Sequence, residues 1–140
     1  MSQASDYLED KLLDHVLRNT AYTSPTTVYV GLFTSDPSVG NTDEELEAGT
    51  IDNEVSGFDY TRKAATFSAA SGGSITTSGN ITFDPANGGD WGTITHVAIM
   101  DASTAGTGNV LFYGQLATEK LIQDGDTFQI TAGNLTVTLA

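Results

Sequence analysis

Hydrophobic positions near the start of the chain recur with the period of a helix. These positions are Leu8, Leu12, Leu13, Val16 and Leu17. Their spacing of three and four residues predicts an amphipathic helix over residues 6–18, with one apolar face to pack. Asp6 is suited to cap the start of this helix, with Glu9 three residues later, and Asn19 is suited to end it.

After the helix, the pattern becomes that of strands and turns. Residues 26–34 are rich in β-branched and aromatic side chains, which favour a strand. Tyr29 and Phe33 are expected to face one side of it. The other side is expected to carry Val28, Val30 and Leu32. Because both sides are apolar, the strand is predicted to be central and covered on both faces, with the helix a candidate for one cover.

The next segment, residues 36–59, is strongly acidic and is predicted to be a surface loop. It holds eight carboxylates and no Lys or Arg. Long loops of this kind lie on the surface and often serve function. The part from Asp43 to Glu54 could hold a cation, although a solvated loop is the more common outcome for such a sequence.

The second half of the chain alternates short apolar runs with glycine-rich turns, such as those at 71–73 and 124–126. A strand over 93–101 is expected to pair with one over 110–116 as a hairpin. This rhythm predicts a mainly β fold, a β-sandwich or jelly roll with one N-terminal amphipathic α-helix. A single domain, residues 1–140, accounts for the whole chain.

The charge of the chain narrows its possible partners. Eighteen Asp and Glu residues face five Lys and Arg, for a formal net charge of −13, and cysteine is absent. Too few cations are present to neutralise phosphates, so no direct contact with nucleic acid or anionic lipid is expected. No apolar run reaches the roughly 20 residues that span a bilayer. The acidic start is unlike a signal peptide, so we expect a soluble protein made in a cytoplasm.

Candidate chemical motifs are weak, and we expect neither catalytic residues nor a metal or other cofactor. His15 and His96 have no ligand-like neighbours, and no G-x-S-x-G motif accompanies them. The Asp-Gly-Asp at 124–126 lacks the rest of a calcium loop, so a β-turn is the better interpretation. The loop at 87–92 lacks the lysine of a phosphate-binding loop and instead presents Trp91.

Apolar side chains on both faces of the strands allow two interpretations. One is a two-layered core capped by the helix, and the other is a subunit interface, since obligate interfaces resemble a core cut in half. Trp91 is likewise either a core residue, which we favour, or an exposed contact. The interface candidates are Leu8, Leu12, Val16, Tyr29, Phe33, Trp91, Phe112 and Tyr113.

Several segments of the chain follow one another as in a known family. They are residues 6–37, 54–57, 60–62, 64–73, 91–96, 111–114, 124–127 and 132–139. In this order they resemble a family of small bacteriophage virion proteins commonly labelled phage tail fibre protein. The chain departs from the family pattern in a longer acidic insertion, residues 39–53.

The resemblance implies a non-enzymatic structural component of a tailed phage virion, assembled in the host cytoplasm. Its partners would be other virion proteins, and it would act as a homo-oligomer or on a larger lattice. The family label favours a tail-associated subunit of fibre, adaptor or baseplate type. A capsid decoration (cement) protein is the alternative, since the chain is short and has no shaft repeats. A receptor- or carbohydrate-binding module is a second alternative, with Trp91, Tyr60 and the acidic loop as its contact face.

Overall fold

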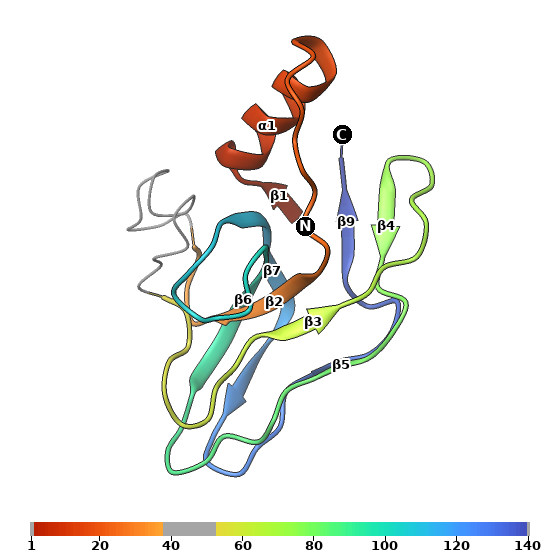
Figure 1. The fold of residues 1–140 in the computed structure, drawn as a ribbon. Helices are drawn as coiled ribbons and strands as arrows, with labels where there is room; N and C mark the ends of the chain where they lie inside the picture. The colour runs from red at the N-terminus through yellow and green to blue at the C-terminus, as the bar shows by residue number, and fades with distance from the viewer. Residues whose placement is uncertain (1, 38–52, 140) are drawn as a thin grey trace.

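The computed structural model of the chain describes residues 2–37 and 53–139. These residues form a mainly β structure with one helix near the N-terminus, which confirms the predicted fold class (Figure 1). In chain order the elements are β1 Ser2–Ala4, α1 Asp6–Leu17, β2 Val28–Phe33, β3 Lys63–Ala65, β4 Ser74–Thr76, β5 Ile81–Thr82, β6 Gly92–Met100, β7 Val110–Ile122, β8 Gln129–Ile130 and β9 Thr136–Thr138.

Five strands form one antiparallel sheet in the order β1-β7-β6-β2-β3. The predicted hairpin is present as β6 and β7, although β7 runs on to Ile122 instead of ending at 116. The pairing of β6 with β7 changes register between Ile94 and His96 and again between Ile99 and Met100. A shift of this kind marks a β-bulge or a similar irregularity of the pairing, which bends a strand locally.

Two short ribbons, β4–β9 and β5–β8, pack against one face of this sheet. Ile81 of β5 and Ile130 of β8 share a core cluster with Val30 and Leu32 of β2. Val137 of β9 shares a second cluster with residues of β6, β7 and α1. The sheet and its ribbons therefore form two layers with the main core between them, as in a sandwich.

The alternation predicted for β2 is confirmed. Val30 and Leu32 enter the main core, whereas Phe33 lies on the opposite face with Met100 and Val110. Both faces are covered, as their apolar character predicts. The helix is not the main cover, however, because α1 makes its principal contacts with β7.

Two local predictions need correction. The helix cap is Ser5, whose side-chain oxygen accepts a hydrogen bond from the backbone N–H of Leu8, and not Asp6. Asn19 does end the helix, with a positive φ of 54°. Most of the acidic loop, residues 38–52, lies outside the described residues. Within the described part, Glu54 is buried and not a surface residue.

Candidate functional site

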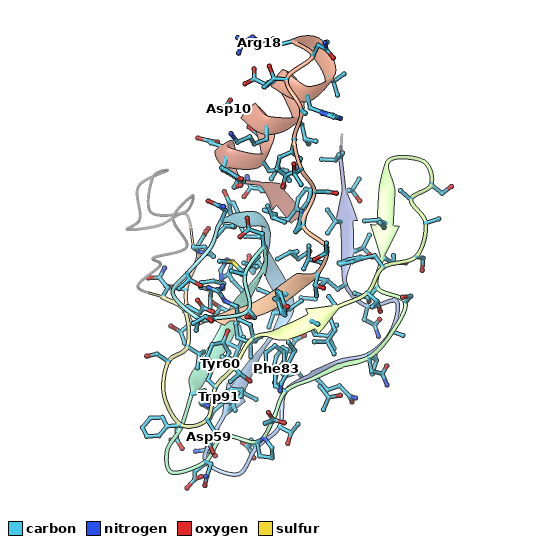
Figure 2. All side chains as sticks on the ribbon, in the orientation of Figure 1. Asp10, Arg18, Asp59, Tyr60, Phe83 and Trp91 are labelled. Carbon is cyan, nitrogen blue, oxygen red and sulfur yellow. The ribbon has the colours of Figure 1, made fainter. Side chains whose placement is uncertain are left out.

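Helix α1 is attached to the sheet by its first turn. The hydroxyl of Ser5 is buried and donates a hydrogen bond to the backbone carbonyl of Val110, the first residue of β7. Leu8 follows one turn later and is buried with Leu111 and Val137. This anchor fixes the direction of α1, which leads away from the sheet toward Arg18 (Figure 2).

The second half of α1 presents an apolar surface to solvent, which we call the helix tip. It consists of Leu13, Val16 and Leu17, whose exposed fractions are 57%, 71% and 75%. The three residues stand at i, i+3 and i+4, so they form one contiguous ridge. The predicted stripe of Leu8, Leu12 and Val16 does not pack as one face, since burial decreases along it as the helix leaves the sheet.

A cavity of about 360 Å³ opens between the β4–β9 ribbon and the main sheet, and we call it the apolar groove. Hydrophobic side chains dominate its walls. Among them are Val28, Phe67, Ile75, Phe112, Val137 and Leu139. Leu139 at its margin is 55% exposed. Concave apolar sites of about 300–1,000 Å³ are typical of binding pockets.

The groove differs from the rest of this acidic chain in charge. The sequence has no Asp, Glu, Lys or Arg between Lys63 and Asp84 and none after Asp126, and the ribbon wall of the groove comes from these two stretches. Residues 11–18 carry two cations and one carboxylate, which is a local net charge of +1 within a chain of −13. The groove wall therefore lacks the negative charge that dominates the molecule, whereas α1 as a whole is acidic, with Asp10 and Asp14 close to the tip residues.

A buried ion pair between Glu54 and Arg62, on the face of the sheet opposite the groove, connects three segments of the chain. Nε and Nη2 of Arg62 each donate to one carboxylate oxygen of Glu54, both at 2.7 Å. Nη1 of Arg62 donates to the backbone carbonyls of Ala102 and Thr107 in the β6–β7 turn. The pair thus fastens this turn to the segment that follows the acidic loop.

Tyr60 links the ion pair to strand β2. Its hydroxyl donates to Oε1 of Glu54 and accepts a hydrogen bond from the backbone N–H of Leu32, both at 2.9 Å. Burial, and then the neighbouring Glu54 carboxylate, raise the pKa of Tyr60 well above its ordinary value. Gly31 makes room for this arrangement, because a Cβ at that position would lie 3.1 Å from the same carboxylate oxygen.

The sequence pattern did not single out this cluster, because Glu54 is one of eight carboxylates in an acidic segment. A usable signal was the spacing of Tyr60 and Arg62. Residues i and i+2 of an extended chain face the same side, so these two were candidates to share one buried carboxylate.

The predicted interface residues are divided between core and surface. Leu8, Phe33 and Trp91 are buried in the core of this chain. Only Val16 is well exposed, while the half-buried members are Leu12, Tyr29, Phe112 and Tyr113. Phe112 is nevertheless part of the groove wall.

Trp91 is a core residue, as favoured. Its ring meets Tyr60 edge-on at a centroid distance of 5.4 Å, and its Nε1 donates to the backbone carbonyl of Phe58. Figure 2 shows Trp91 beside Tyr60 and Phe83. An exposed contact face built on Trp91 and Tyr60 is therefore excluded, because both rings are buried.

The histidines and the acidic turn make local structural contacts. The Nδ1 of His15 accepts from the backbone N–H of Tyr22, and the Nδ1 of His96 lies 2.8 Å from the hydroxyl of Thr95. Asp126 accepts from the backbone N–H of Gln123, as expected of a turn, whereas Asp124 accepts from the backbone N–H of Gly88 in the loop before β6.

Neither a metal-binding cluster nor a membrane-spanning helix is found among the described residues. In 2–37 and 53–139, no group of three or more acidic or histidine side chains is placed to hold a metal ion. The one helix in these ranges is too short and too polar to cross a membrane.

Comparison with known proteins supports the resemblance drawn from the motifs. Residues 3–138 match the model of a family described as Podophage GP4 fiber I protein gp80. No curated protein matches the chain.

Proposed function

Because the chain belongs to the family of podophage GP4 fibre I protein gp80, we propose that it is a tail-associated structural subunit acting through protein–protein assembly. Membership of a fibre family makes the chain a structural component of the phage virion, in contact with other virion proteins. The proposal goes further in three respects. It gives the chain a tail position as a single-domain fibre, adaptor or baseplate-type subunit, a homo-oligomeric state and no catalytic reaction.

The observation that carries the proposal is the presence of two exposed apolar surfaces, the helix tip and the apolar groove. Exposed apolar patches of this kind mark interaction sites. Burial of such surface contributes about 25 cal/mol per Å² before the costs of association. An array of identical subunits then multiplies weak contacts, because each copy is held at more than one point.

Copy number per particle tests the tail position. Purified virions would be analysed by quantitative mass spectrometry against the major capsid protein, and immunogold labelling would locate the chain on the particle. We expect a few copies per hundred capsid subunits, with label on the tail. A ratio near one to one with label on the head would instead identify a capsid decoration protein.

A further inference from the structure

Strand β7 has an open edge beyond the point where β1 ends. β1 pairs with β7 only as far as Gly114, and no other strand in residues 2–37 and 53–139 lies along this outer edge. On the inner edge, the register with β6 places residues 116–119 opposite the single residue Thr95. These four residues therefore have no strand partner on either side within the described part of the chain.

The open edge is chemically suited to one kind of occupant, another extended chain. Its unpaired backbone N–H and C=O groups are complementary to those of a strand. Natural edges are often closed to other chains by charged side chains, and β7 has such charges at Glu119 and Lys120. Residues 110–118, in contrast, contain no Asp, Glu, Lys or Arg. The unprotected part of the edge is therefore residues 115–118.

A cavity of about 550 Å³ lies between this part of β7 and the segment that contains β8. Leu116, Ile122, Phe128 and Ile130 supply its apolar walls, and Lys120 is the one charged residue among those that line it. Alternate side chains of a strand point to the same face. A strand added to β7 would therefore direct every second side chain toward the cavity.

We propose that the outer edge of β7 at residues 115–118 binds an extended segment of another virion protein, which continues the sheet beyond the end of β1. This inference rests on the proposed assembly function and names one surface through which the chain joins the particle. Strand addition of this kind takes its affinity from main-chain hydrogen bonds and its specificity from pockets for alternate side chains. Here the cavity beside β7 is the pocket, and it receives an apolar side chain.

Charge favours a different protein over a second copy as the source of the segment. Two copies of this chain, each with a net charge of −13, repel each other. The partner segment is uncharged where it faces residues 115–118, since a charge there would meet no counter-charge on the edge. A carboxylate near Lys120 is the one charge that this surface would attract.

The first test removes a backbone donor from the edge. Ala117→Pro deletes the N–H at this position and blocks pairing, whereas the matched control Ala117→Ser keeps the N–H. Proline is tolerated at an edge position without a ladder partner. Ala117 is exposed and has no strand partner among the described residues, so the proline variant should fold.

The second test fills the edge with the chain's own N-terminus. Ser2 pairs with Gly114, so four residues inserted between Met1 and Ser2 would extend β1 along residues 115–118. The insert Thr-Val-Thr-Val has high β-propensity and should occupy the edge. The matched control is Gly-Ser-Gly-Ser, which has the same length and low β-propensity.

The assay is a competition for places in the particle. Each variant would be expressed from a plasmid in host cells infected with the wild-type phage, and mass spectrometry would compare the ratio of variant to wild-type chain in purified virions and in the lysate. Both controls should enter virions as the wild type does. Ala117→Pro and the Thr-Val-Thr-Val form should be depleted about tenfold, the loss expected from one or two backbone hydrogen bonds.

The inference is overturned if Ala117→Pro or the Thr-Val-Thr-Val form enters virions as efficiently as its control. Circular dichroism checks the fold of each variant, and if Ala117→Pro is unfolded, the pair of inserts decides alone. If the isolated wild-type chain forms an oligomer that Ala117→Pro dissociates, the segment comes from a second copy and the assignment to another protein is wrong. The proposed structural role fails separately, if the wild-type chain is absent from purified virions.

Discussion

Replacing Arg62 with methionine measures how strongly the buried ion pair with Glu54 stabilises the fold. Methionine has a similar length but removes the charge and every N–H donor. The Arg62 side chain is 0% exposed and that of Glu54 is 3% exposed. In the variant, the carboxylate would stay out of water, and the donors left to it among the described residues are the Tyr60 hydroxyl and the backbone N–H of Gly106.

The expected cost follows from this geometry. Removing one partner of a buried ion pair costs about 3–5 kcal/mol, because the remaining charge has lost its counter-charge without gaining water. The carbonyls of Ala102 and Thr107 lose their donor as well. A domain is stable by only about 5–15 kcal/mol. At about 4 °C per kcal/mol for this size, the melting temperature should fall by about 12–20 °C.

The next residue in the chain, Lys63, provides a matched control. Its Nζ lies 2.7 Å from Oδ2 of Asp84, the same N–O distance as in the Glu54–Arg62 pair. The side chains are 27% and 66% exposed, however. Exposed ion pairs contribute about 0–1 kcal/mol. Lys63→Met makes the same change in net charge as Arg62→Met, so the difference between the variants measures the burial of the pair together with the two carbonyl hydrogen bonds of Arg62.

Urea unfolding followed by Trp91 fluorescence is a suitable assay. Trp91 is the single tryptophan of the chain, and its ring packs against Tyr60 in the same region. Adding Glu54→Gln to Arg62→Met should restore part of the lost stability, because it removes the stranded charge. Equal losses in Arg62→Met and Lys63→Met, or a loss below about 1 kcal/mol in the former, would refute the reasoning.

Three further predictions concern the turn, the helix anchor and the pH dependence. Gly108→Ala should cost about 1–3 kcal/mol more than Gly106→Ala in chemical unfolding. Both residues have φ near +75°, so the backbone strain is the same, but a Cβ at 108 would overlap Ala102 at 2.5 Å whereas one at 106 meets nothing within 4 Å. Equal costs would show that the overlap relaxes. Ser5→Ala should lower stability by about 1–3 kcal/mol, because the helix loses its cap and a buried carbonyl loses its donor; hydrogen exchange should rise most in the first turn of α1, and unchanged exchange there would contradict the anchor role. The pKa of Tyr60 in the folded state is raised above its ordinary value of 10.0. Below pH 10 the tyrosine is protonated in both the folded and the unfolded state, so this contribution to stability is fully present. As the pH rises above 10 the unfolded state loses its proton first, so the free energy of unfolding should fall. Unfolding midpoints from pH 9 upward should therefore decline less steeply in Tyr60→Phe than in the wild type, and parallel curves would argue against a raised pKa.

The elements that follow from local spacing were predictable. The helix over Asp6–Leu17, strand β2 and the β6–β7 hairpin each depend on neighbours a few residues apart. The family relationship was also predictable, since its motifs lie in order along the chain. The predicted cap, Asp6, was wrong, because Ser5 is of an equally suitable residue type for the N-cap position. The carbonyl of Val110 distinguishes them, since it is reached only when β7 lies beside the helix.

The amino-acid sequence by itself determined the element types, the two faces of β2 and the absence of charged residues from 64–83 and 127–140. Only the tertiary structure decided which apolar and charged groups are removed from water. Leu8 and Val16 belong to one helical stripe, yet the first is buried and the second is 71% exposed, because α1 meets β7 only at its base. Glu54 is buried among acidic neighbours because Arg62 and the distant β6–β7 turn meet it. Periodicity records the relation of a residue to its neighbours in the chain, whereas burial depends on segments that the fold brings together from far apart.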